Sequence, residues 1–229
     1  MKLLKTIEHQ IKGIRAMKTT TLMALALSIS LGSSAWCAGP ALTPSEIQNA
    51  IREGSKYKTA DRVFEHSKGQ GKRVQLASAM AADGISKYAT FFNDRLFVVA
   101  QSAAANQQMR DLKATDVESK GLLHAFVEIT ARGSHGTGKL DRRFGNDRAH
   151  LVLKIGDRII QPVEKSMNYR SGQSDLMYVL GANSGRITLM YAFDVSPQDL
   201  QSPVEVILID GDGHRHEHEA NLGGVLDID

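Results

Sequence analysis

Apolar and polar residues follow a helical period near residue 45 and a strand period further along the chain. The run Thr43-Pro44-Ser45-Glu46 has the pattern of a capping box with proline at the first helical position. Apolar residues then recur at helical spacing, at Ile47, Ala50 and Ile51. We therefore expect a helix from about 44 to 53, ended by Gly54.

Strand-like residues fill most of the stretch from 73 to 100. Residues 73–77 read as a short strand, and residues 85–92 and 95–100 are rich in β-branched and aromatic side chains. Asn93-Asp94 stands between the last two runs and predicts a hairpin turn. The aromatic residues of this stretch are expected in the core: Tyr88, Phe91, Phe92 and Phe97.

Beyond residue 120 the chain consists of short strand-like runs separated by turn residues. A helix is predicted just before them, over 103–112, from the spacing of its apolar side chains. The runs cover residues 122–131, 149–155, 158–163, 186–195 and 204–210. The turns include Gly156-Asp157, Ala182-Asn183-Ser184-Gly185 and Asp210-Gly211-Asp212-Gly213. Several short strands at this spacing predict an antiparallel β-sandwich.

Four of these runs carry a resemblance to a known family. They are Phe126-Val127-Glu128-Ile129-Thr130, Leu151-Val152-Leu153 followed by Gly156-Asp157, residues 187–195 closing at Ser196-Pro197, and residues 204–210. Through them, residues 122–219 resemble the immunoglobulin-like, telokin-like domains of many exported bacterial proteins of unknown function. The resemblance implies a binding or scaffolding role and supplies no catalytic residues.

Together these patterns predict an α+β chain in three parts. Residues 1–38 form an extended n-region and a secretory signal peptide. Residues 39–120 form a small mixed α/β region. Residues 121–229 form an immunoglobulin-like antiparallel β-sandwich domain.

Residues 17–38 have the pattern of a cleavable secretory signal. Met17-Lys18 begins a short positive segment, residues 22–31 form a compact apolar core, and small residues follow. Such a core is too short to span a bilayer, which takes about 20 apolar residues. We therefore expect a periplasmic or secreted protein.

Both ends of this signal have alternatives. Cleavage after Ala35 and cleavage after Ala38 both fit the preference for small residues, and translation begins at either Met1 or Met17. Cys37 is the only cysteine, and the bulky residue before it disfavours a lipid anchor. Cleavage after Ala38 leaves a mature chain without a thiol, which excludes disulfides and a cysteine nucleophile.

The net charge of the chain without its predicted signal excludes nucleic acid as a partner. The whole chain has 28 Lys and Arg against 25 Asp and Glu, a formal net charge of +3. Residues 1–38 hold five of the basic residues and one of the acidic residues, which leaves 23 against 24, a net charge of −1. Nucleic-acid binding needs a surplus of Lys and Arg on one face. We expect an unidentified protein or small ligand as partner, no nucleic acid, and no stable membrane insertion after cleavage.

The run from Gly133 to Leu140 nearly matches the phosphate-binding loop G-x-x-x-x-G-K-[ST]. In that loop the last hydroxyl binds Mg²⁺, and Leu140 has no hydroxyl. Residues 141–146 show no amphipathic helix whose N-terminus would face a phosphate. We expect a connection between strands that binds no nucleotide.

Residues 214–219, with the sequence His-Arg-His-Glu-His-Glu, are the most unusual run in the chain. On a strand of period two, His214, His216 and His218 lie on one face, and imidazole binds Zn²⁺, Cu²⁺ and Ni²⁺. Neighbouring positions on that face are about 7 Å apart, so the three imidazoles need not converge. Two interpretations stay open: a transition-metal site, and a polar strand that protects a sheet edge.

The sequence contains no familiar catalytic motif. Asp210-Gly211-Asp212-Gly213 resembles the opening of a Ca²⁺ loop, but Asn221 stands where the bidentate glutamate belongs, which favours a hairpin turn. Neither G-x-S-x-G nor H-E-x-x-H occurs. The leading hypothesis is an exported, non-enzymatic binding or scaffolding protein without a cofactor. The alternative is extracytoplasmic binding of Zn, Cu or Ni through the H-x-H-x-H strand, and a third is a hydrolase with an unfamiliar site.

Overall fold

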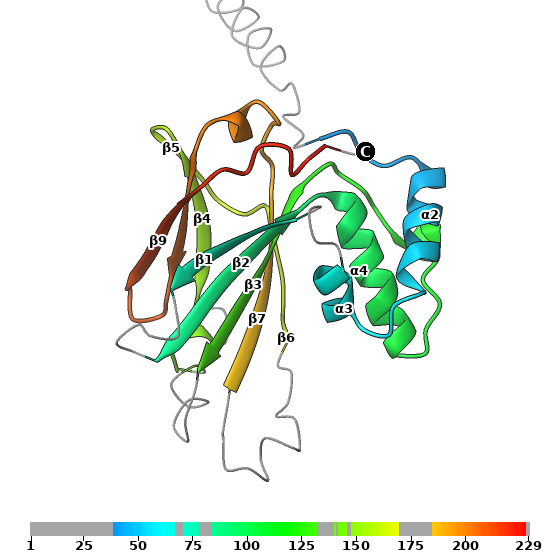
Figure 1. Ribbon diagram of the computed structural model, residues 1–229, viewed down its shortest axis with the longest axis horizontal. Coiled ribbons are helices and arrows are strands. Elements are labelled where there is room, and N and C mark those ends of the chain that lie inside the picture. The colour runs from blue at the N-terminus through cyan, green and yellow to red at the C-terminus, as the bar shows by residue number, and fades with distance from the viewer. Residues whose placement is uncertain are drawn as a thin grey trace, which may run out of the picture. The chain divides into compact units, whose positions relative to one another are not determined.

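The computed structural model describes residues 39–66, 71–77, 84–131, 140, 142–145, 148–169 and 185–227. The predicted signal and the loop of residues 133–139 lie outside these described residues. Within the described part of the chain, no helix is long and apolar enough to cross a membrane. The described residues form a mostly β structure with two antiparallel sheets and a small group of helices (Figure 1).

Five strands form the larger sheet, and every neighbouring pair is antiparallel. Their order is β1-β2-β3-β7-β6. The bounds are β1 Lys72–Ala77, β2 Ile85–Phe92, β3 Leu123–Ala131, β6 Glu164–Tyr169 and β7 Gly185–Phe193. β3 and β7 pair over their whole length, from Leu123 opposite Phe193 to Ala131 opposite Gly185. The strands predicted near β1, β2, β3 and β7 are confirmed.

Four strands form the smaller sheet, in the order β5-β4-β8-β9. The bounds are β4 His150–Ile155, β5 Arg158–Ile160, β8 Val204–Ile209 and β9 Arg215–Ala220. The predicted Gly156-Asp157 turn joins β4 to β5. The polar run is confirmed as a strand from residue 215, since β9 pairs with β8 from Arg215 opposite Ile209 to Ala220 opposite Val204, and His214 precedes it.

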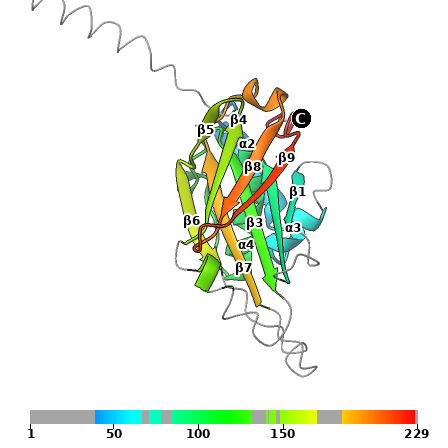
Figure 2. The same ribbon diagram turned by 90° about the vertical axis from the view of Figure 1, so that its left-hand side faces the viewer.

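One hydrophobic cluster contains side chains from both sheets, which lie against each other in Figure 2. Alternate positions enter it, as period two requires: Ala125, Val127 and Ile129 from β3, and Val204, Val206 and Leu208 from β8. A polar bond also joins the sheets. The buried hydroxyl of Tyr191 in β7 donates to the carbonyl of Ala149, just before β4, at 2.9 Å.

Helices pack against the other face of the larger sheet. They are α2 Pro44–Gly54, α3 Ala60–His66 and α4 Asp94–Gln107, with short 3-10 turns η1 Ala114–Asp116 and η2 Asp199–Gln201 elsewhere. A second hydrophobic cluster joins the helices to Phe92, Phe126 and Met190 of the sheet. The Phe64 ring of α3 stacks on Phe126 with ring centroids 5.0 Å apart. The larger sheet is therefore covered by the smaller sheet on one face and by the helices on the other.

α2 begins at the predicted capping box. The Thr43 hydroxyl accepts the Glu46 amide at 3.3 Å, and the Glu46 carboxylate accepts the Thr43 amide at 2.7 Å. α2 ends at Gly54, where an added Cβ would lie 2.3 Å from the Val99 carbonyl oxygen and 2.6 Å from the Ser102 Cβ. Only glycine allows α2 and α4 to approach this closely.

The predicted hairpin at Asn93-Asp94 is wrong, because a helix begins there. Asn93 is the N-cap of α4, and its side-chain oxygen accepts the Leu96 amide at 3.1 Å. Residues 95–100, expected as a strand, form the first turns of this helix. Of the helix predicted over 103–112, residues 103–107 form its last part, and residues 108–112 lie beyond its end. The β-branched residues of the segment are helical because packing against the sheet outweighs their strand preference.

The expected strand over 158–163 is two separate features. β5 ends at Ile160, and the Val163 amide then donates to the Ala192 carbonyl of β7 at 2.8 Å. The chain thus passes from the smaller sheet to the larger one within three residues. The expected boundary at residue 120 also runs through one sheet, because β2 and β3 pair across it along their whole length.

A buried carboxylate at the start of α4 joins the helices to the larger sheet. Asp94 accepts the Ser119 hydroxyl at 2.6 Å and three successive amides, of residues 120–122, at 2.8 to 3.2 Å. Its Oδ1 also faces Nε2 of His124 in β3 at 2.6 Å. Burial raises the pKa of Asp94, but the hydrogen bonds from His124 and Ser119 outweigh burial and hold that pKa below its usual value.

The first described residues pack onto the same connection. The Leu42 amide donates to the Ser119 hydroxyl oxygen at 2.7 Å. Gly121 has a φ of +67°, and a Cβ there would lie 1.9 Å from the Gly39 carbonyl oxygen. Gly121 therefore needs both the backbone freedom and the small size of glycine.

We predict that Asp94→Asn destabilises the protein by about 3 kcal/mol at neutral pH. The asparagine NH2 group replaces one acceptor oxygen of the carboxylate, so buried donors around it lose their acceptor. The folded pKa of Asp94 is depressed, so its contribution is present above the unfolded value of about 3.9 and is lost as pH falls below it. Urea unfolding of both proteins at neutral pH and at about pH 3 measures the difference.

The difference in unfolding free energy between parent and variant should narrow at the lower pH. Asp157→Asn, in the exposed Gly156-Asp157 turn, is the control and should change stability by no more than about 0.5 kcal/mol. An equal loss for Asp94→Asn at both pH values would contradict the assigned role.

Candidate functional site

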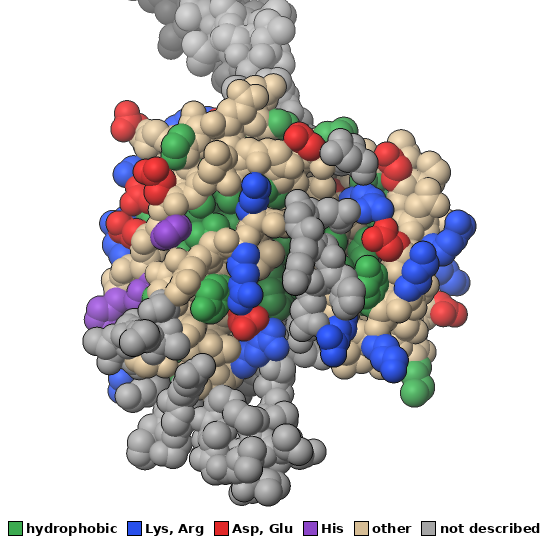
Figure 3. Space-filling model, in the orientation of Figure 1, with side chains coloured by type: hydrophobic (Ala, Val, Ile, Leu, Met, Phe, Trp, Pro, Cys, Tyr) green, Lys and Arg blue, Asp and Glu red, His purple; other side chains and the backbone are tan. Residues whose placement is uncertain are grey.

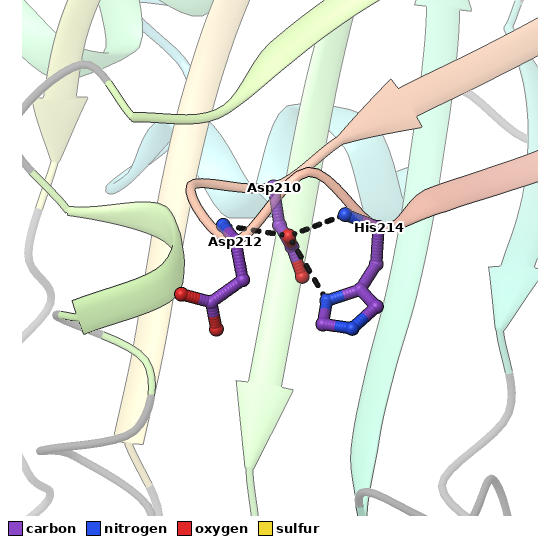
Figure 4. A group of neighbouring side chains, drawn as sticks. All are labelled: Asp210, Asp212 and His214. Atoms are coloured by element: carbon purple, nitrogen blue, oxygen red, sulfur yellow. Dashed lines mark hydrogen bonds and ion pairs between the residues drawn. The ribbon is translucent and has the colours of Figure 1, made fainter.

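The hairpin turn between β8 and β9 brings three potential metal ligands together. Asp210, Asp212 and His214 each offer one ligand atom, and these atoms lie within 4.8 Å of one another (Figure 4). Asp210 follows the last residue of β8, and His214 precedes the first residue of β9. The paired strands therefore hold both ends of the turn.

The Asp-Gly-Asp-Gly sequence accounts for the shape of this turn. Oδ1 of Asp210 accepts the amides of Asp212 and His214, each at 3.0 Å, and the Asp210 amide donates to the His214 carbonyl at 3.0 Å. An aspartate that accepts the amide two residues on forms an Asx turn. Gly213 has a φ of +83°, which glycine adopts without strain. The predicted hairpin turn is confirmed.

Arg143 contacts the other oxygen of Asp210. Its Nε donates to Oδ2 at 2.7 Å, and its Nη2 forms a second bond to the same oxygen. The Arg143 Nε also lies 3.9 Å from Oδ2 of Asp212, and its backbone carbonyl accepts the Gly211 amide at 2.7 Å. The guanidinium lies over the Phe144 ring, 5.3 Å from the centroid. Arg143 therefore places a positive charge beside both carboxylates.

Charge and exposure differ among the three potential ligands. The Asp210 side chain is fully buried. Burial raises its pKa, but hydrogen bonds from Arg143 and the turn amides outweigh burial, so the pKa of Asp210 lies below its usual value. Asp212 is 39% exposed and His214 is 65% exposed. An ion that arrives from solvent meets Asp212 and His214 first and finds a charged carboxylate behind them.

The three histidines that the sequence grouped have different neighbours in the structure. Nδ1 of His214 lies 3.4 Å from Oδ1 of Asp210, and Nε2 of His216 lies 3.8 Å from Oδ2. His216 is 16% exposed, whereas His218 is exposed and lies two residues further along β9. Among the described residues, only His214 of the three belongs to the ligand group. Binding of one metal by all three histidines stays a prediction.

The other face of β9 carries paired charges. Arg215 and Glu217 form an ion pair at 2.7 Å, and Lys154 of β4 bonds to Glu205 of β8 at 2.8 Å. The Lys154 hydrogen bond lowers the pKa of Glu205. Figure 3 shows acidic, basic and histidine side chains interspersed on the side of the molecule where β9 lies. Charges of both signs on an edge strand disfavour pairing with another sheet.

The expectation that no amphipathic helix follows the phosphate-loop-like run of residues 133–140 is wrong. Leu140 and residues 142–144 are helical, where no amphipathic helix was expected. Leu140 and Phe144 are four residues apart, share one face of the helical turn and are buried in the core between the sheets. The loop itself lies outside the described residues, so its lack of nucleotide binding stays a prediction.

A second cluster, around Asp94, contains the residue types of a serine-hydrolase site but not their arrangement. Ser119 and His124 both bond to Asp94. In a serine hydrolase the histidine stands between the other two and takes the proton of the serine hydroxyl. Here the carboxylate stands in the middle, and His124 is buried with its ring stacked 4.1 Å from that of Phe97. This cluster gives the serine no base.

The hairpin group has the composition of a divalent-metal site. Two carboxylates and one imidazole form an oxygen and nitrogen donor set that suits Zn²⁺ and its neighbours in the first transition row. A site made of oxygen alone would instead favour Ca²⁺ or Mg²⁺. The imidazole of His214 therefore decides the class of ion.

Sequence reasoning found His214 and the turn but missed how two aspartates and one arginine join them. Asp210 and Asp212 were considered only as part of a Ca²⁺ loop, although a tight turn brings residues 210 and 214 together and so joins them to the adjacent histidine. Arg143 comes from a distant part of the chain. No local pattern points to its contact with Asp210.

Comparison with protein-family models, curated proteins and solved structures gives no match to this chain. The interpretation of the hairpin group rests on its geometry and chemistry.

We predict that Asp210→Asn destabilises the protein by roughly 2 to 4 kcal/mol, because it leaves a mostly buried guanidinium without its charged partner. The matched control is Asp212→Asn, whose carboxylate is partly exposed and 3.9 Å from Arg143, with an expected loss below about 1 kcal/mol. Thermal and urea unfolding measure both. Equal losses in the two variants would show that the ion pair between Arg143 and Asp210 does not supply the expected stability.

Proposed function

We propose that this chain is an exported, non-enzymatic binding protein whose ligand is a divalent transition metal at the β8–β9 hairpin. In this proposal the two sheets form an immunoglobulin-like sandwich that serves as a rigid support. The group of Asp210, Asp212 and His214, with ligand atoms within 4.8 Å of one another, is the observation that carries it.

Two features of the hairpin support metal binding over a purely structural turn. The Asp210 carboxylate is oriented by two backbone amides, so the turn itself fixes its position. His214 and Asp212 are open to solvent, which gives an ion a route of entry. His216 stands next to the group, with Nε2 3.8 Å from the same carboxylate.

A non-enzymatic role agrees with the geometry of the polar clusters among the described residues. The Ser119, Asp94 and His124 cluster has the carboxylate in the middle and is buried. Two carboxylates and a histidine beside an arginine give a binding group, and no described residue near them supplies a nucleophile with an adjacent base. Ion binding needs only the donor set.

We predict micromolar binding of at least one of Zn²⁺, Cu²⁺ and Ni²⁺ by the purified protein, measured by calorimetry after treatment with a chelator. The double variant Asp212→Asn, His214→Ala removes two of the three ligands and should weaken that binding by about tenfold or more. Both positions are exposed, so this variant is expected to fold.

His218→Ala is the matched control, because His218 lies on the same strand but outside the ligand group, and it should leave the affinity unchanged. If binding is lost in His218→Ala and kept in the double variant, the ligands are the histidines of the H-x-H-x-H run and not the hairpin group. An absence of binding with all three metals would overturn the proposed function.

Export is proposed from the signal pattern of residues 17–38. Cleavage after Ala35 or after Ala38 leaves intact the segment that begins at Gly39 and packs beside Gly121.

We predict that the protein recovered from a secreting cell begins at Trp36 or at Gly39. Mass spectrometry of the intact protein and of its N-terminal peptide measures this. A mature chain that still carries the apolar core of residues 22–31 would overturn the export proposal and indicate a membrane anchor instead.

A further inference from the structure

We infer that Arg143 determines the metal affinity of the hairpin, because its guanidinium already occupies the side of the carboxylate pair where a metal would bind. In this view Arg143 is the cation that the hairpin holds in the metal-free protein. The inference rests on the proposed function and adds the residue that sets the affinity of the hairpin for the metal.

The contacts of Arg143 place its charge between the two carboxylates. Two of its nitrogens donate to Oδ2 of Asp210, and its Nε is 3.9 Å from Oδ2 of Asp212. The side chain is 12% exposed, so water screens its charge only in part. A divalent ion bound to either of these oxygens would lie within a few ångströms of the guanidinium and would be repelled by it.

The carboxylate of Asp210 does not depend on Arg143 for its orientation. Oδ1 accepts the amides of Asp212 and His214 at 3.0 Å, and these two bonds are made within the turn. Removal of the guanidinium therefore leaves Asp210 in place with Oδ2 available. The position vacated by the positive charge is then open to a metal ion.

The backbone and the side chain of Arg143 play separate parts. The backbone carbonyl accepts the Gly211 amide at 2.7 Å, a bond that every residue type can make. Phe144, next in the chain, is fully buried and anchors the segment. A substitution at Arg143 therefore removes the charge and keeps a backbone anchor of the turn.

The test is zinc calorimetry on the full protein and on Arg143→Gln. We expect Arg143→Gln to bind Zn²⁺ at least about tenfold more tightly than the parent, and zinc to raise the melting temperature of the variant more than that of the parent. The matched control is Arg158→Gln, which removes a charge paired with Asp199 elsewhere and should leave zinc affinity unchanged.

The outcomes separate this inference from the proposed function. If parent and variant bind zinc equally and both lose it with Asp212→Asn, His214→Ala, the function stands and the role of Arg143 is overturned. If only Arg143→Gln binds zinc, the inference is supported and the proposed function of the parent fails. If neither folded protein binds zinc, both fail.

A second measurement on the parent covers the case in which Arg143→Gln does not fold. The Nε–H signal of Arg143 in a nitrogen-proton NMR spectrum reports its bond to Asp210. We expect that signal to move toward the position of a solvated arginine as Zn²⁺ is added. A signal that is unchanged when the site is saturated with zinc would overturn the inference.

Discussion

The buried carboxylate of Asp94 is the interaction on which the arrangement of helices and sheets depends. One side chain receives a hydroxyl, three successive backbone amides and an imidazole, and the donors come from β3 and the connection before it. Apolar contacts between α4 and the larger sheet provide most of the stabilisation, but they are non-directional and permit sliding. The hydrogen bonds of Asp94 are directional, so they fix where α4 starts relative to the sheet.

Asp210 is a second buried carboxylate with a different balance of neighbours. Asp94 is enclosed by its donors, whereas Asp210 has the exposed groups of Asp212 and His214 on one side and a guanidinium on the other. A buried charge costs free energy unless it is fully hydrogen-bonded, and both aspartates meet that requirement. Only Asp210 meets it with groups that an arriving ion is able to replace, which is why we interpret Asp94 as structural and Asp210 as part of a site.

Local signals predicted the elements of this chain better than their assembly. The capping box at Thr43 and the alternating strands were predictable because their causes lie within a few residues. Asn93-Asp94 was misread because asparagine serves both hairpin turns and helix N-caps, and burial of the following apolar residues against the sheet decided between them. The contact between Arg143 and Asp210 was beyond sequence reasoning, since it depends on how the 140–145 segment packs against a turn formed much later in the chain.

The register of β3 with β7 has a consequence for the order in which the molecule forms. Leu123 is opposite Phe193, and Leu222, Val225 and Leu226 belong to the core that this sheet covers. The centre of the larger sheet therefore cannot close until residue 193 has been synthesised, and the core is complete only after Leu226. Contacts between such distant parts of a chain form slowly. Most of the chain must therefore be synthesised before its central pairing and its core can form.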